Sequence, residues 1–332
     1  MYAVIVSCSP LWIVPARKQR GQIMKTAACA GKGGVGKTLT ACAIALNALR
    51  QKQKTLIIDF DEGHAVRLTL GVPQGVPSNV IDEIETNLSV VVVDALPFVS
   101  ARAWKETHST FEGYFDQFSG DLGIVALADM VEGFFGVPTD VIMLQRFAVL
   151  VETLNIAVET GVEQLVIDVE PTAGLQRLFS NADATLRSLQ NLKRSNRALL
   201  SALRLKWRDI VAYIEGTYIQ NIEHYADRIE RALNILRTAD YMLIAIPKVA
   251  SIEQTFKVRN MIEGFGAQVK TCALNDLRGE PEEQQFYMDL RPHDLPVARI
   301  HHIPHFETMP VEARRAALIQ MSWTFLTNAS SR

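Results

Sequence analysis

The 332-residue chain has few of the features that mark specialised protein classes. Its four cysteines are scattered and include no CxxC pair, which argues against a disulfide scaffold or a cysteine-built zinc site and favours a reducing cytoplasm. A net charge of −2 provides no basic field for nucleic acid, so DNA is a less favoured partner. The 19 glycines and 13 prolines are near average usage, which excludes a collagen-like or fibrous chain. The length and composition indicate a globular protein of about two domains.

The first 24 residues do not match a targeting segment. Residues 1–15 are mostly apolar and are followed by the basic residues Arg17, Lys18 and Arg20. A signal peptide carries its positive charge before the apolar stretch, and a membrane-spanning helix needs about 20 apolar residues. We therefore expect residues 1–24 to be an extension outside the core, with the folded domain beginning near Met24.

One glycine-rich segment carries the strongest functional signal in the sequence. It matches the pattern GxxxxGK[ST] in full and reads Gly31, Lys32, Gly33, Gly34, Val35, Gly36, Lys37 and Thr38. A short strand (25–30) is expected before it and an amphipathic helix (36–51) after it. Backbone N–H groups of such a loop cradle phosphates, while its lysine reaches the β- and γ-phosphates and its hydroxyl binds Mg²⁺. The motif predicts binding of ATP or GTP with Mg²⁺.

Two apolar runs end in carboxylates. Residues 55–58 lead into Asp59 and Asp61, and residues 165–167 lead into Asp168. Continuous apolar runs of this length are typical of buried parallel strands, and the carboxyl ends of such strands form the ligand-binding edge of an open α/β sheet. We therefore expect these aspartates to lie at the same edge as the phosphate loop.

The octamer GKGGVGKT is identical, letter for letter, to the loop of the deviant-Walker ATPases, and the chain resembles that class. The resemblance implies that Lys32 reaches across a homodimer to the partner's nucleotide and that Asp61 positions the attacking water. It also implies catalytic roles for Lys37 and a Mg²⁺ shell formed by Thr38, Asp59 and Asp168.

Three further segments resemble one branch of that class, the arsenite-pump and tail-anchored-protein-targeting ATPases. Residues 168–178 (DVEPTAGLQRL) are similar to its DTAPTGHTLRL, and residues 241–247 (YMLIAIP) are similar to its VVTIPE. Residues 269–275 (VKTCALN) resemble a strand whose final asparagine reads adenine. This implies an adenine contact at Asn275, and a base-pocket wall of Pro304, His305 and Phe306. The branch's CxxC and its clustered arsenite-binding cysteines are missing, so no zinc or arsenite site is expected. No cysteine lies between Cys42 and Cys272 to hold a bridging iron–sulfur cluster, so that site is not expected either.

The sequence also predicts a helical insertion. Residues 175–237 contain no proline and no strand signal, and their apolar residues recur at helical spacing. A second apolar cluster comprises Met130, Phe134, Phe135, Met143, Leu144, Phe147 and Leu150. Helices at these two places form a groove for a transmembrane segment in the tail-anchored-protein-targeting ATPases. Packing of the helices on the core remains the alternative.

These observations lead to a defined expectation. The fold is an α/β P-loop NTPase, with a mostly parallel sheet between helices and an inserted helical subdomain. The function is a dimeric Mg²⁺-dependent ATPase that couples closure to binding of a hydrophobic client helix or a membrane partner. The alternatives are a partitioning or positioning ATPase of the ParA and MinD type, acting on DNA or a membrane surface, and a nucleotide sensor that does not hydrolyse ATP.

The protein is expected in the cytoplasm, with transient membrane association as an option. The predicted division is an extension at 1–24, an ATPase core at 25–93, 161–174 and 238–332, and helical insertions at 94–160 and 175–237.

Overall fold

The computed structural model describes residues 24–61, 65–72, 78–94, 141–169, 174–180, 220–280, 283–290 and 296–329, with isolated helical positions between 184 and 194. The chain divides into two compact units. The first, here called the sheet unit, comprises Met1–Asp94, Thr153–Arg177 and Asn234–Arg332. The second, the helical unit, comprises Ala95–Glu152 and Leu178–Leu233. The predicted N-terminal extension lies almost entirely outside the described residues.

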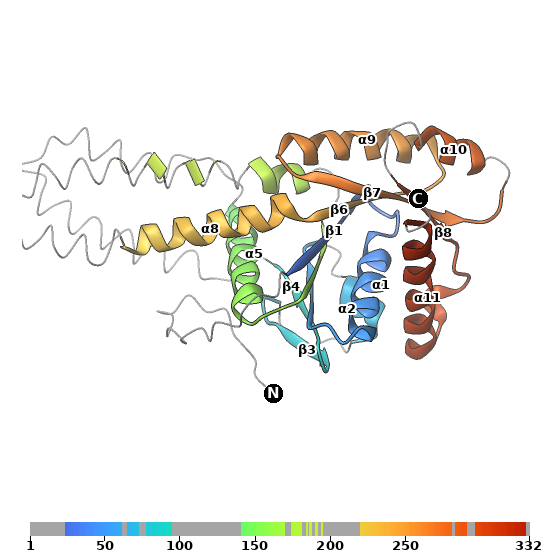
Figure 1. The fold of residues 1–332 in the computed structure, drawn as a ribbon, viewed down its shortest axis with the longest axis horizontal. Helices are drawn as coiled ribbons and strands as arrows, with labels where there is room; N and C mark the ends of the chain where they lie inside the picture. The colour runs from blue at the N-terminus through green and yellow to red at the C-terminus, as the bar shows by residue number, and fades with distance from the viewer. Residues whose placement is uncertain are drawn as a thin grey trace, which may run out of the picture. The chain divides into compact units, whose positions relative to one another are not determined.

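The sheet unit is built on one sheet with the strand order β3-β4-β2-β5-β1-β6-β7-β8 (Figure 1). Every neighbouring pair is parallel except β3 and β4, which are antiparallel. The predicted mostly parallel α/β sheet is confirmed. The strands are β1 (Lys25–Gly31), β2 (Thr55–Asp59), β3 (Asp82–Glu85), β4 (Leu88–Val92), β5 (Gln164–Asp168), β6 (Asp240–Ala245), β7 (Gln268–Leu277) and β8 (Val297–His301).

The central strands form because their side chains are apolar on both faces. Every residue of β2 and β5 is buried, including the runs Leu56–Ile58 and Leu165–Ile167. Parallel strands covered by helices on both sides need such continuous apolar sequence, whereas a half-exposed strand would alternate. The aspartates that end these two strands are therefore carried to the edge of the sheet with no exposed surface of their own.

Helices cover both faces of this sheet. Helices α1 (Lys37–Arg50), α2 (Ala65–Leu70) and α11 (Val311–Ala329) pack together, and α1 lies against β1, β2 and β5. On the opposite face α9 (Val249–Gly264) runs along β6 and β7, next to α10 (Glu283–Leu290) (Figure 1). Two long helices, α5 (Val141–Glu159) and α8 (Gln220–Thr238), each contribute residues to both units. Among the helices of the described ranges, none has the length and apolarity needed to cross a membrane.

The strand order creates a ligand-binding position at β1. The chain leaves β1 through α1 toward β2 on one side of the sheet, whereas β6 follows on the other side of β1. Ligands of open α/β sheets bind at this kind of reversal, outside the carboxyl ends of the strands. Asp168 is the register partner of both Cys29 on β1 and Asp59 on β2, so it lies between the other two strand ends.

Candidate active site

Two glycines shape the loop between β1 and α1. A Cβ at Gly31 would lie 2.4 Å from the carbonyl oxygen of Ile244 on β6, so a side chain here would push the two strands apart. Gly36 is the N-cap of α1 and has φ +94, a backbone conformation that glycine adopts without strain. The free N–H groups at the start of α1 are thereby presented at the loop, and such groups bind phosphate.

The predicted phosphate-binding residues occupy different depths of this loop. Lys32, Gly33 and Gly34 are exposed at its crest, whereas Lys37 is only 4% exposed. The crest position leaves Lys32 accessible from outside the subunit, and its contact with a partner's nucleotide stays a prediction. The buried position of Lys37 places its charge beneath the loop, close to the aspartates at the strand ends.

Thr38 and Asp168 are joined by a direct hydrogen bond. The Thr38 hydroxyl donates to Oδ2 of Asp168 with an oxygen–oxygen distance of 2.6 Å, across 130 residues of sequence. The other carboxylate oxygen, Oδ1, is buried and has no hydrogen-bond partner among the residues that the structure describes. Burial raises the pKa of Asp168 from 3.8 to about 7, against the opposing effects of the Thr38 hydrogen bond and the Lys37 charge.

This pair fits the metal ion that the sequence predicts. Mg²⁺ prefers oxygen ligands and keeps several of its waters, so a hydroxyl and one carboxylate are a suitable protein contribution. An orphaned buried oxygen is costly, and a cation or its bound water would satisfy Oδ1 of Asp168. Thr38 and Asp168 therefore have the chemistry that a Mg²⁺ site requires.

Lys37 forms an ion pair with Asp61. The two side chains approach to 3.4 Å between Nζ and Oδ2, with Lys37 at 4% and Asp61 at 21% exposure. The sequence predicted both residues at the site but did not predict that they contact each other. The contact brings the predicted phosphate-binding cation against the predicted water-positioning carboxylate, so a change of partner at one side chain affects the other.

The Asp59 side chain holds the backbone of neighbouring residues, a role that the sequence did not predict. Its Oδ1 accepts the N–H of Asp61 at 3.3 Å, and its Oδ2 accepts the N–H of Val66 at 3.1 Å, the second residue of α2. The carboxylate therefore holds the backbone both at Asp61 and at the start of α2. A place for Asp59 in the Mg²⁺ shell stays a prediction beside this observed bracing of the backbone.

Asn275, the predicted adenine contact, lies against the phosphate loop. Its Nδ2 donates to the carbonyl oxygen of Val35 at 2.8 Å, across 240 residues of sequence. The predicted wall residues Pro304, His305 and Phe306 follow β8, the strand next to β7. Phe306 packs partly on the apolar core, while Pro304 and His305 are exposed. Contact of these four residues with a base stays a prediction.

The predicted client groove is described only in part. Met130, Phe134 and Phe135 lie outside the described residues, as do the side chains of Met143 and Leu144 and residues 195–219 of the predicted helical insertion. Phe147 and Leu150 are buried, so neither offers a surface to a partner. Within the helical unit, Arg228 of α8 donates to both oxygens of Glu152 on α5, at 3.0 and 2.5 Å. This paired contact links the two helices.

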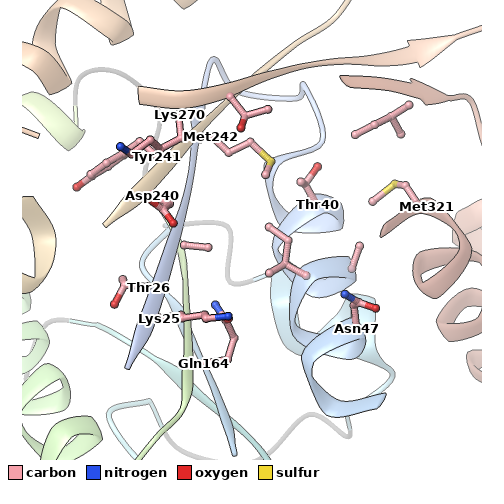
Figure 2. A pocket seen from close by; sticks show the side chains of 15 residues that line it. Lys25, Thr26, Thr40, Asn47, Gln164, Asp240, Tyr241, Met242, Lys270 and Met321 are labelled. Atoms are coloured by element: carbon pink, nitrogen blue, oxygen red, sulfur yellow. The ribbon is translucent and has the colours of Figure 1, made fainter. Parts of the chain in front are cut away.

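A cavity of about 250 Å³ lies at the opposite edge of the sheet, where the strands begin (Figure 2). Lys25, Asp240 and Lys270 stand at its polar side, and Met242 and Met321 contribute to its apolar side. Three buried side chains of its described lining have hydrogen-bonding capacity: Thr40 and Gln164 donate to backbone carbonyl oxygens, and Tyr241 also has an interaction partner. The described lining therefore presents no unsatisfied buried group for a ligand, and the phosphate loop remains the candidate site.

Comparisons with known proteins agree with this geometry. The family model described as "Anion-transporting ATPase" matches residues 24–303. The ATPase GET3C of Arabidopsis thaliana is 21% identical over 276 residues, which are 79% of this chain and 69% of that protein. The putative arsenical pump-driving ATPase of Prosthecochloris vibrioformis is 25% identical over 271 residues, which are 78% of this chain and 62% of that protein. The ATPase GET3 of Paracoccidioides lutzii is 28% identical over 162 residues, which are 49% of this chain and 44% of that protein. The chain thus spans less than two thirds of two of these relatives. The resemblance predicted from the motifs is confirmed.

Proposed function

The chain belongs to the anion-transporting ATPase family and is an ATPase of that family; from this premise we propose that it works as a Mg²⁺-dependent homodimer whose nucleotide-driven closure controls binding of a hydrophobic client or a membrane partner. The observation that carries the proposal is Asp168, with one oxygen on the Thr38 hydroxyl and the other without a partner. The ion pair of Lys37 with Asp61 lies in the same site. These contacts unite the metal-binding, phosphate-binding and water-positioning groups that the sequence predicted.

Phosphate binding changes the partner of Lys37. The loop N–H groups and the start of α1 hold the phosphates, and Lys37 turns its charge from Asp61 to the β- and γ-phosphates. Thr38 and Asp168, with Asp59 nearby, would hold Mg²⁺, which when bound would neutralise part of the phosphate charge. The Asp61 carboxylate then accepts a hydrogen bond from the attacking water.

The turn that carries Asp61 links this chemistry to the rest of the subunit. Asp59 accepts hydrogen bonds from the backbone N–H groups of Asp61 and Val66. A movement of Asp61 in response to the γ-phosphate is therefore passed to the start of α2. In the proposed dimer Lys32 of each subunit contributes a cation to its partner's phosphates, which stabilises charge in the transition state. Hydrolysis separates the γ-phosphate from the nucleotide, so the negative charge that both subunits contact is lost and the closed dimer relaxes.

The helical insertions at 94–160 and 175–237 are the proposed binding part of the molecule. The named relatives include an arsenical pump-driving ATPase and GET3 proteins, which favours a soluble pump motor or a targeting chaperone over a metabolic enzyme. We place the protein in the cytoplasm, with transient membrane association through its partner. A partitioning or positioning ATPase is the competing function, because Asp59, Phe60 and Asp61 at the end of β2 resemble that type.

Replacement of Asp61 by Asn tests the hydrolytic proposal. The amide keeps the size of the side chain but is a weaker acceptor, so we expect Mg²⁺-dependent ATP turnover to fall by about 100-fold or more. Nucleotide affinity should be retained or improved, because Lys37 no longer has a carboxylate competing with the phosphates. The matched control is Asp227→Asn, at an exposed position of α8. Unchanged turnover in Asp61→Asn would exclude this mechanism and favour a sensor that does not hydrolyse ATP.

The partner class is tested by measuring turnover of the purified protein alone, with a detergent-solubilised hydrophobic helix, with DNA and with liposomes. A hydrophobic helix that binds and changes turnover would support the client-binding proposal. Stimulation by DNA or liposomes alone would contradict it and support the positioning ATPase.

A further inference from the structure

The end of β7 is irregular in a way that redirects Asn275. The pairing of β7 with β8 shifts by one residue between Leu274 and Leu277, so this segment forms a bulge. Inside the bulge Asp276 has φ +62, an uncommon conformation for a residue with a side chain. Its carboxylate lies 2.5 Å from Nδ1 of His302 and 3.5 Å from a guanidinium nitrogen of Arg278. These contacts hold the strained residue in place, and bulges are a known means of re-aiming a neighbouring side chain.

The redirected Asn275 amide meets the phosphate loop at its last peptide before α1. Besides the hydrogen bond to the Val35 carbonyl, Nδ2 lies so close to Gly36 that an added Cβ there would be 2.2 Å away. Position 36 therefore needs glycine for two reasons: a side chain there would clash with Asn275, and the backbone has a positive φ. Two segments 240 residues apart in sequence are fitted to each other at this point.

From this contact we propose that Asn275 is a positioning residue for the phosphate loop, acting through the orientation of the Val35–Gly36 peptide. The carbonyl and the N–H of a trans peptide point in opposite directions, and the described backbone contains no cis peptide. With the Val35 oxygen held by Asn275, the Gly36 N–H is directed away from β7, toward the side on which the loop receives phosphate. The inference rests on the proposed function, since it assumes that this loop binds the phosphates of ATP.

The same amide has capacity left for a second partner. An asparagine side chain has two N–H donors and one carbonyl acceptor, and the Val35 contact uses one donor. The remaining donor and acceptor match the adjacent acceptor and donor on an adenine edge. One side chain would then join the base to the phosphate loop, and removing it would weaken binding of the phosphates even without a base.

Base-free tripolyphosphate distinguishes loop positioning from adenine contact. We would measure the Kd of Mg²⁺-tripolyphosphate and of Mg²⁺-ATP by calorimetry, using the full-length protein. The variants are Asn275→Ala, which removes the amide, and Asn275→Leu, which keeps most of its volume without a donor. Both should raise the Kd for tripolyphosphate by about fivefold to tenfold, the effect of one lost hydrogen bond. Neutral replacements avoid adding charge near the phosphates.

Asn260→Ala, at an exposed position of α9, is the matched control and should change neither Kd. Thermal unfolding of the ligand-free variants shows whether they remain folded. Weaker binding of both ligands by folded Asn275 variants would support loop positioning. Loss of ATP affinity with unchanged tripolyphosphate affinity would overturn it and leave only a base contact, and no loss for either ligand would also overturn it. Wild-type protein that binds neither ligand would contradict the proposed function itself.

Discussion

Asp168 shows how one residue combines a structural cost with a functional use. It has no exposed surface, and its charged form is disfavoured by burial, so its pKa rises from 3.8 to about 7. One of its oxygens is nevertheless left without a partner. A group of this kind lowers the stability of the ligand-free fold at neutral pH, and the proposed Mg²⁺ ion would compensate for that cost.

The first prediction concerns the pH dependence of stability without nucleotide or Mg²⁺. The folded pKa of Asp168 is above its unfolded value, so its favourable contribution is complete below pH 3.8 and is lost as the pH rises toward about 7. Asp168→Asn removes this titration. Between about pH 5.5 and about pH 8, the free energy of unfolding of the wild type should therefore fall by about 2 kcal/mol relative to that of the variant.

Denaturant unfolding at the two pH values measures this difference, with Asp227→Asn as an exposed control. The Asn variant should also lose Mg²⁺-dependent turnover. A stability difference that is the same at both pH values would show that Asp168 is already ionised without cost in the folded protein.

The second prediction concerns the cysteines. Cys29, Cys42 and Cys272 are buried, and burial raises the pKa of Cys272 to about 12 and those of the other two thiols well above their usual range. Thiolates are the reactive form, so these three residues should resist maleimide labelling in the native protein and react only after unfolding. Site-resolved mass spectrometry after timed labelling checks this. Native labelling of any of the three at the rate of a free thiol would contradict the burial.

At the scale of elements, α11 holds α2, the short helix that follows Asp61. Arg314 donates to the carbonyl oxygen of Leu68 and Arg315 to that of Leu70, each at 3.1 Å. Leu68 and Leu70 lie in the last turn of α2, where free carbonyls attract cations. Arg315 also reaches Glu85 on β3 at 3.0 Å. The C-terminal helix therefore fixes α2, the helix whose start is bonded to Asp59.

The third prediction tests this link. Arg315→Ala removes hydrogen bonds from a charged donor, and we expect the free energy of unfolding to fall by about 1–2 kcal/mol. Arg259→Ala serves as the control, because Arg259 pairs with Glu263 on the exposed side of α9 and such pairs contribute little. Chemical denaturation measures both. Equal effects of the two substitutions would mean that α11 does not stabilise α2 through Arg315.

The sequence predicted some parts of this site well because their signals are local. The octamer at 31–38 and the apolar runs ending in Asp59 and Asp168 predicted a phosphate loop beside acidic strand ends in a mostly parallel sheet. The hydrogen bond from Asn275 to Val35 was not predictable, because it depends on the strand order β1-β6-β7 and on a bulge at Asp276. The Lys37–Asp61 pair and the bonds of Asp59 to the backbone likewise depend on side-chain packing, which sequence patterns do not specify.

At the scale of the whole molecule, the proposed mechanism requires two subunits. Each phosphate loop carries Lys37 beneath it and an exposed Lys32 at its crest. The proposal assigns Lys37 and Asp61 to the subunit's own nucleotide and Lys32 to the partner's. A symmetric dimer would then contain two composite sites, each built from both chains.

Mixing two inactive variants tests whether each site is built from both subunits. Lys32→Ala and Asp61→Asn should each reduce Mg²⁺-dependent ATP turnover to near background. In a mixed dimer, the site on the Lys32→Ala subunit has its own Asp61 and receives Lys32 from the other chain, so it works. An equimolar mixture should recover about one quarter of wild-type turnover, since about half of the dimers are mixed and each contains one complete site.

The measurement is the rate of phosphate release from ATP by each variant and by the mixture at equal total protein concentration. The account predicts recovery only in the mixture. A mixture no more active than its parents would contradict a composite site, and a fully active Asp61→Asn variant would contradict the assigned chemistry.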